Sequence, residues 1–152
     1  MNSAEELAET ALLEGLADAD IAALAAIATE AVFGPQEQVY AAGSAGDSMY
    51  VIVEGEFAVR VLDEHGEEVD VATLKPGTYF GEMEVIGAIN RTAAIVSLDD
   101  GRCHRFDATA LLSVLGQHDH LAAHFYRQVC RGLIQRLKNT TRDMGYFKAR
   151  AR

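Results

Sequence analysis

The first apolar pattern along the chain is helical. Between residues 4 and 31 the larger apolar side chains recur at near-helical spacing, in a background of Ala, Leu and Glu, which are strong helix formers. These positions are Leu12, Leu13, Leu16, Ile21, Leu24 and Ile27. Asp18 and Asp20 are candidate caps, because an aspartate carboxylate accepts hydrogen bonds from the amides of a first turn. The pattern predicts short helices that end before Gly34-Pro35.

The pattern changes between residues 37 and 106, where short β-rich runs alternate with turns built from Gly, Asp and Pro. In one run Phe57, Val59 and Val61 occupy every second position, which directs one face of a strand inward. The predicted strands are residues 39–41, 49–53, 57–62, 69–74, 92–98 and 102–106. Short strands at such intervals are typical of a β-sandwich or a small barrel.

A second helical pattern begins at Asp107. It predicts a short helix to about Leu115, a break at Gly116 and a long helix from about Asp119 to Asp143. Every fourth residue of the long helix is apolar, namely Leu121, Phe125, Val129, Leu133 and Leu137. This stripe is either core packing or the seam of a dimer, and the sequence leaves both interpretations open.

Composition is consistent with one domain over residues 1–152, with N-terminal helices at 4–32, a β-barrel at 37–106 and C-terminal helices at 107–145. The 152 residues are 49% apolar, which is enough for a core. The net charge of −10 repels nucleic acid and acidic membrane surfaces, so we expect neither as a partner. Neither an export signal nor a membrane-spanning run of apolar residues is visible, and the two cysteines match no metal or redox spacing. We expect a cytoplasmic protein.

The most informative stretch is residues 76–96, between two predicted strands. Gly81 allows a close approach of the backbone, and residues 83–86 have the composition of one helical turn whose free amides face an anion. Arg91 offers a planar pair of donors that matches a phosphate. Glu82 is compatible with such a site when it accepts hydrogen bonds from hydroxyls, as a ribose would supply. The stretch predicts a site for a sugar phosphate.

These residues resemble the cyclic-nucleotide-binding domain family, and the resemblance covers residues 12 to 137. The phosphate-binding cassette of the family looks like FGE, a variable stretch and R-[ST]-A, which is similar to residues 80–82 and 91–93 here. Residues 43–55 are similar to the glycine-marked entry into the family's barrel. The resemblance implies an α+β fold, namely a small antiparallel β-barrel or jelly roll (a double-stranded β-helix, cupin-like), with N-terminal helices and a long C-terminal helix.

The resemblance also implies a ligand, cAMP or cGMP, and no cofactor. By that resemblance Glu82 binds the ribose 2′-hydroxyl, Arg91 binds the cyclic phosphate and Thr92 reaches the phosphate or the base. The amides of Met83 and Glu84 join them, and the cassette is completed by Gly81 and Ala93. Gln135 and Arg136 lie about where related domains place contacts to the base, so the long helix is expected to close over the ligand. Tyr146 and Phe147 either stack on the base or belong to a tail.

Two positions depart from the family pattern. Glu84 stands where many members carry a small residue and places a second carboxylate near the phosphate amides, and Asn90 stands where proline is frequent. The predicted function is a cyclic nucleotide sensor that signals to a partner protein by closure of the C-terminal helix. The alternative is a barrel that has lost its ligand, with Glu84 as the candidate cause, and serves as a protein-interaction domain.

Other functions are less consistent with the sequence. Related regulators of the catabolite-activator type continue into a helix-turn-helix, and with a chain end at Arg152 we expect no such DNA-binding domain. No set of nucleophile, base and oxyanion donors is visible, so we expect no enzyme. His118, His120 and His124 include a pair spaced to hold a metal on one helical face, but the solvated start of a helix explains them better.

Overall fold

The computed structural model describes residues 2–150, and beyond residue 142 it describes only the side chain of Met144. The helices are α1 (Ser3–Ala8), α2 (Asp18–Ala25), α3 (Glu82–Gly87), α4 (Ala108–Gln117) and α5 (Asp119–Arg150). The strands are β1 (Thr29–Phe33), β2 (Gln38–Tyr40), β3 (Ser48–Glu54), β4 (Phe57–Leu62), β5 (Glu68–Leu74), β6 (Tyr79–Phe80), β7 (Ala94–Ser97) and β8 (Gly101–Asp107). The described part of α5 therefore includes the backbone of Tyr146 and Phe147 but not their side chains, whose proposed stacking lies outside the described residues.

The strands of this part of the chain form two antiparallel sheets, in the orders β1-β8-β3-β6 and β2-β7-β4-β5. Apolar side chains from both sheets meet between them, and their centre is aromatic: Tyr50 stacks on Phe80 with ring centroids 5.0 Å apart, and Phe57 packs against Phe80. Large aromatic rings bury much apolar area, so this cluster joins the two sheets. The predicted α+β jelly roll is confirmed.

A second core lies between the helices and the first sheet. It contains Leu13 and Leu24 from the N-terminal segment, Met49 from β3, Leu111 from α4 and Phe125 from α5. Asp107 ends β8 and caps α4 by accepting a hydrogen bond from the Ala110 amide at 3.1 Å. The helices are therefore anchored to the barrel at one end.

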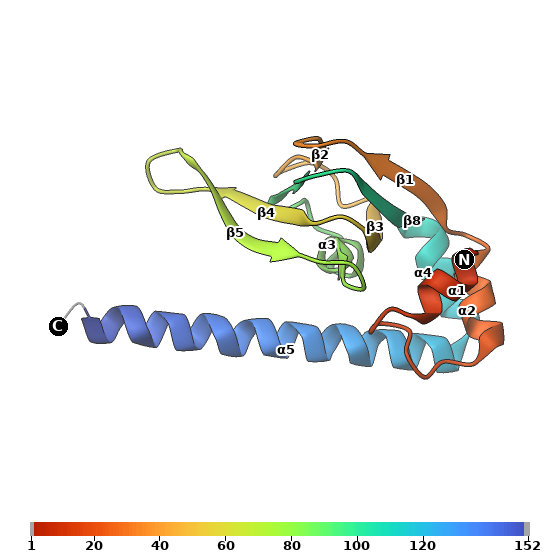
Figure 1. Ribbon diagram of the computed structural model, residues 1–152. Helices are drawn as coiled ribbons and strands as arrows, with labels where there is room; N and C mark the ends of the chain where they lie inside the picture. Colours follow the sequence, from red (N-terminus) through yellow and green to blue (C-terminus); the bar gives the residue numbers. More distant parts are fainter. Residues whose placement is uncertain (1, 151–152) are drawn as a thin grey trace.

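The apolar stripe of α5 has two parts. Leu121, Phe125 and Val129 are buried in the helix-side core, so the first part is core packing. Further along, Leu133 is only partly buried against that core, Leu137 is 66% exposed, and Ile134 beside the stripe is 58% exposed. Figure 1 shows the consequence: α5 starts among the other helices, runs along the barrel past α3 and continues beyond it.

Several sequence predictions about local structure were wrong. Residues 29–33 form strand β1 instead of extending the helical region, and β6 was not predicted. The N-cap position of α2 is occupied by Ala17, which makes no side-chain capping hydrogen bond, and Asp18 and Asp20 lie in the first turn of the helix. The break before the long helix lies at His118 and not at Gly116, because α4 extends to Gln117.

Among the described helices, none combines the length and the apolar character that crossing a bilayer requires.

Candidate ligand-binding site

The site begins at Gly81, which joins β6 to α3. Its φ of 87° lies in the left-handed region, where a side chain is strained. A Cβ atom at this position would also lie 2.9 Å from Arg91 Nη1 and 2.9 Å from the Ser48 carbonyl oxygen. Glycine is therefore needed both to turn the chain into α3 and to let Arg91 pass beside the backbone.

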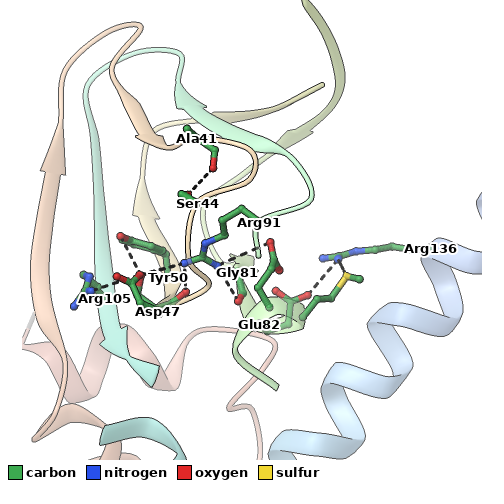
Figure 2. A network of polar contacts seen from close by, with 12 residues as sticks. Ala41, Ser44, Asp47, Tyr50, Gly81, Glu82, Arg91, Arg105 and Arg136 are labelled. Atoms are coloured by element: carbon green, nitrogen blue, oxygen red, sulfur yellow. Dashed lines mark hydrogen bonds and ion pairs between the residues drawn. The ribbon is translucent and has the colours of Figure 1, made fainter. Parts of the chain in front are cut away.

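Arg91 is almost completely buried, with 3% of its surface exposed. Its Nη2 donates to the Ser48 carbonyl at 2.6 Å and to the Ser48 hydroxyl at 3.1 Å, and its Nη1 donates to the Gly81 carbonyl at 3.2 Å (Figure 2). The Tyr40 ring lies over the guanidinium, 3.9 Å from Cζ to the ring centroid. These contacts hold the guanidinium in place, because they come from three separate segments, at Tyr40, Ser48 and Gly81.

The guanidinium of Arg91 is not fully satisfied. Its buried Nε has no hydrogen-bond partner among the residues that the structure describes. Its nearest carboxylates are those of Asp47, at 3.7 Å from Nη2, and of Glu84, at 3.9 Å from Nη1. A buried cation without a close counter-charge and with a free donor is costly. The arrangement favours an additional acceptor near Arg91.

Glu82 connects the cassette to the C-terminal helix. Its carboxylate is 3% exposed, and its Oε1 lies 3.2 Å from Nη1 of Arg136 on α5 (Figure 2). Burial raises the pKa of the Glu82 carboxyl above its ordinary value, and the Arg136 charge opposes that shift. The ion pair therefore holds a carboxylate available at the mouth of the site.

A cavity of about 230 Å³ lies between α3, the second sheet and α5. Its volume is near the lower end of the range for small-molecule sites, about 300 Å³. The lining residues are Tyr40, Val59, Ala72, Leu74, Phe80, Gly81, Glu82, Met83, Glu84, Thr92, Ala93, Ile95 and Arg136. One wall is therefore apolar, and the other carries the polar groups of the cassette.

The cavity brings together most of the predicted site residues. Gly81, Glu82, Met83, Glu84, Thr92, Ala93 and Arg136 all line it. Arg91 does not, but its guanidinium lies against the ring of Tyr40, which does. Gln135 is also outside the lining, and its amide donates to Asn139 on the solvent side of α5. The roles of these residues toward a ligand stay predictions.

Sequence reasoning missed the apolar wall of the cavity. Tyr40 comes from β2, Val59 from β4, and Ala72 and Leu74 from β5. Only Val59 carried a signal, because the period of two in its strand predicts an inward side chain. The others reach the cavity through strand pairing between distant segments, and nothing local marks them.

Other candidate chemistry lies apart from this cavity. No group of three or more His, Cys, Asp or Glu side chains within the described residues is arranged to hold a metal ion. Of the three histidines at the start of α5, His118 has its Nδ1 4.0 Å from Oδ1 of Asp20. Cys103 is buried and Cys130 exposed, and neither forms a disulfide. Burial raises the pKa of the Cys103 thiol to about 12, which disfavours the nucleophilic thiolate form.

Comparison with known proteins agrees with the geometry. The family model described as cyclic nucleotide-binding domain matches residues 30–118, which include the whole cassette and nearly all of the barrel. The chain belongs to the cyclic nucleotide-binding domain family. The resemblance seen in residues 80–82 and 91–93 is thereby confirmed.

Relatives of this cyclic nucleotide-binding domain belong to larger proteins. It is 26% identical over 140 residues to the CRP-like cAMP-activated global transcriptional regulator of Mycobacterium tuberculosis (strain CDC 1551 / Oshkosh), a match that covers 92% of this chain and 61% of the regulator. The chain thus spans less than two thirds of that relative.

Solved structures show the same fold. One is the N-terminal domain of a transcriptional regulator from Streptomyces coelicolor A3(2), with a TM-score of 0.75 and 24% identity, covering 89% of this chain and 94% of the other. A second is the regulatory subunit of a cAMP-independent protein kinase A from Trypanosoma cruzi, solved bound to guanosine. Its TM-score is 0.69 at 26% identity, and the match covers 74% of this chain and 40% of the other.

Proposed function

We propose that this domain is a regulatory sensor that binds a cyclic nucleotide, cAMP or cGMP, in the cavity beside α3 and catalyses no reaction. One observation carries the proposal: the buried guanidinium of Arg91 has an Nε without a partner among the described residues, directly behind the first turn of α3. A phosphate oxygen would satisfy this donor and balance the buried charge. Membership of the family supports the same ligand.

The rest of the cavity fits the other parts of such a ligand. Glu82 accepts a hydrogen bond from the ribose 2′-hydroxyl, and the amides of Met83 and Glu84 face the phosphate. The apolar wall formed by Val59, Ala72 and Leu74 packs against the base. Because Tyr40 and Glu84 lie between the cavity and Arg91, entry of the phosphate requires these two side chains to shift.

Ligand binding is signalled by a change in the position of α5. Arg136 is the residue of this helix that lines the cavity, and it holds Glu82 through the ion pair. A ligand that engages Glu82 and the base therefore changes the contacts of α5, and only contacts that differ between two states shift a population. The break between α4 and α5 at His118 is the hinge for closure.

A protein partner binds α5, and its affinity depends on the position of this helix. The exposed apolar side chains of α5, Ile134 and Leu137, are where we place that partner or a second copy of the chain. The net charge of −10 disfavours nucleic acid and acidic membranes as partners, and we place the protein in the cytoplasm.

A second candidate function is a protein-interaction domain whose barrel binds no ligand. The observation that favours it is Glu84, whose carboxylate already lies 3.9 Å from Arg91 and supplies part of the missing counter-charge. In that case the cavity would stay empty at any nucleotide concentration, and the exposed part of α5 would be the functional surface.

Calorimetric titration with cAMP, cGMP and 5′-AMP separates the two functions. The sensor predicts saturable binding of at least one cyclic nucleotide and weaker binding of 5′-AMP, whose open phosphate carries more charge beside Glu84. Lack of heat for both cyclic nucleotides at millimolar concentration would favour the ligand-free barrel.

A further inference from the structure

The side chain of Glu84 has no role in the proposed cyclic nucleotide site, yet it is buried in the lining of the cavity near Arg91. Its side chain is 8% exposed, and its carbonyl oxygen accepts a hydrogen bond from the Ile89 amide at 3.1 Å. Gly46 packs so closely that a Cβ there would lie 2.5 Å from Glu84 Cβ. The backbone and Cβ of Glu84 are therefore fixed against the loop before β3, and the carboxylate stays within side-chain reach of the cavity.

The charges that line the cavity are unfavourable for an anion. The charged lining residues are Glu82, Glu84 and Arg136, and Arg136 is already paired with Glu82. Arg91 is behind the lining, with its terminal nitrogens bonded to Ser48 and Gly81. A phosphate in the cavity thus lies close to the Glu84 carboxylate, and two like charges repel strongly in a partly buried site.

The same charges are favourable for hydroxyl groups. A carboxylate can only accept hydrogen bonds, and Glu82 and Glu84 present two of them from one turn of α3. A 3′,5′-cyclic phosphate offers only acceptors at its phosphate end. An uncharged nucleoside carries a free 5′-hydroxyl there, which donates, and keeps the 2′-hydroxyl for Glu82.

We propose that the cavity also binds uncharged nucleosides, and that Glu84 selects for them by accepting a hydrogen bond from the 5′-hydroxyl. Glu84 thereby sets the ratio between nucleoside and cyclic nucleotide affinity. The proposal rests on the cavity of the proposed function but not on a cyclic nucleotide being its ligand.

Calorimetric titration with five probes tests this assignment: adenosine, guanosine, 5′-deoxyadenosine, cAMP and cGMP. The native chain should bind adenosine about tenfold or more tightly than 5′-deoxyadenosine, the effect of one hydrogen bond to a charged group. Glu84→Ala should abolish that difference and tighten cyclic nucleotide binding by about tenfold or more. Glu67→Ala is the matched control, because it removes an exposed carboxylate that does not line the cavity.

Folding of the variants is checked by circular dichroism and thermal unfolding. If Glu84→Ala does not fold, Glu84→Gln preserves the shape and should lose most of the preference for the 5′-hydroxyl, since the charge of the acceptor is gone. Equal affinities of the native chain for adenosine and 5′-deoxyadenosine would overturn the assignment, as would a Glu84 variant that binds adenosine like the native chain.

The outcomes distinguish this proposal from the proposed function. Binding of cyclic nucleotides without binding of nucleosides removes the nucleoside proposal and leaves the sensor intact. Binding of nucleosides alone removes the cyclic nucleotide and supports the role of Glu84. If none of the probes binds at millimolar concentration, both proposals fail and the ligand-free barrel remains.

Discussion

Arg136 and Glu82 form an ion pair of 3.2 Å that joins the C-terminal helix to the cassette. The two ends of the pair differ greatly in exposure, since the Arg136 side chain is 51% exposed and that of Glu82 only 3%. A surface ion pair contributes little, but here one partner is a buried carboxylate whose charge has to be compensated. The pair therefore couples the position of α5 to the charge state of the site.

Arg136→Ala should release α5 from the cassette. We expect faster amide exchange across residues 129–137 in the variant, and in the native chain we expect a bound nucleotide to slow exchange across the same segment. Arg131→Ala is the control, because this arginine is exposed on the same helix and does not line the cavity. Exchange in the native chain that is indifferent to saturating nucleotide would rule out closure by α5.

Glu82→Gln should discriminate between ligands by their ribose. The proposed partner of the carboxylate is the 2′-hydroxyl, so the variant should bind a cyclic nucleotide about tenfold or more weakly, and a 2′-deoxy cyclic nucleotide should show the same loss with the native chain. Titration of both proteins with both ligands gives a thermodynamic cycle, in which the losses from the variant and from the deoxy ligand should not add if they remove the same hydrogen bond. Additive losses in that cycle would assign another role to Glu82.

Gly81→Ala should disturb the site through contact as well as through backbone strain. Its Cβ would lie 2.9 Å from Arg91 Nη1, whereas Gly66 has a similar φ of 78° and nothing within 4 Å of its Cβ position. We expect Gly66→Ala to cost about 1 kcal/mol of unfolding free energy and to leave ligand binding unchanged. Gly81→Ala should cost more and weaken binding, as measured by chemical denaturation and titration; equal behaviour of the two variants would contradict the close packing.

Glu6 should make stability depend on pH in the acidic range. Its carboxylate binds the Arg102 guanidinium and His104 Nε2, and the Arg102 hydrogen bond, opposed by burial, lowers the pKa of Glu6 below 4.5. Stability from this group is fully present above the unfolded pKa and is lost as the pH falls through the lower folded pKa. Glu6→Gln should therefore cost about 1–2 kcal/mol at pH 7 and less at pH 3, because part of the native contribution is lost as the pH falls below the unfolded pKa.

Urea unfolding of the native chain and of Glu6→Gln at both pH values measures this difference. A difference between the two proteins that stays constant with pH would mean that the carboxylate contributes through packing and not through its charge.

The sequence was sufficient for the parts of the fold with local periodicity. The alternation at residues 57–61 located β4, and the spacing from Leu121 to Val129 located the buried part of α5, because period and burial agree in both. It failed at β1, where Thr29–Phe33 continues an alanine-rich segment and becomes a strand only by pairing with β8. Strands selected by a distant partner carry little local signal.

The candidate site also has one part that local sequence predicts and another that depends on contacts between distant segments. The cassette residues from Gly81 to Glu84 are adjacent in the sequence, and one turn of helix keeps them together in the fold. Tyr40 and Leu74 reach the cavity only through the pairing of β2 with β7 and of β5 with β4. The position of Arg91 behind Tyr40 could not be predicted either, since it depends on hydrogen bonds to Ser48 and Gly81.

The most direct test of the cyclic nucleotide site is the affinity of Arg91→Ala for cAMP and cGMP relative to the native chain. Loss of the guanidinium leaves the cyclic phosphate without its cation, so we expect binding weaker by about 2–5 kcal/mol. Thermal unfolding has to show that the variant is folded, because Arg91 also bonds to Ser48 and Gly81. A folded variant that binds a cyclic nucleotide with native affinity would contradict the account, because the buried Nε of Arg91 would then not meet the phosphate.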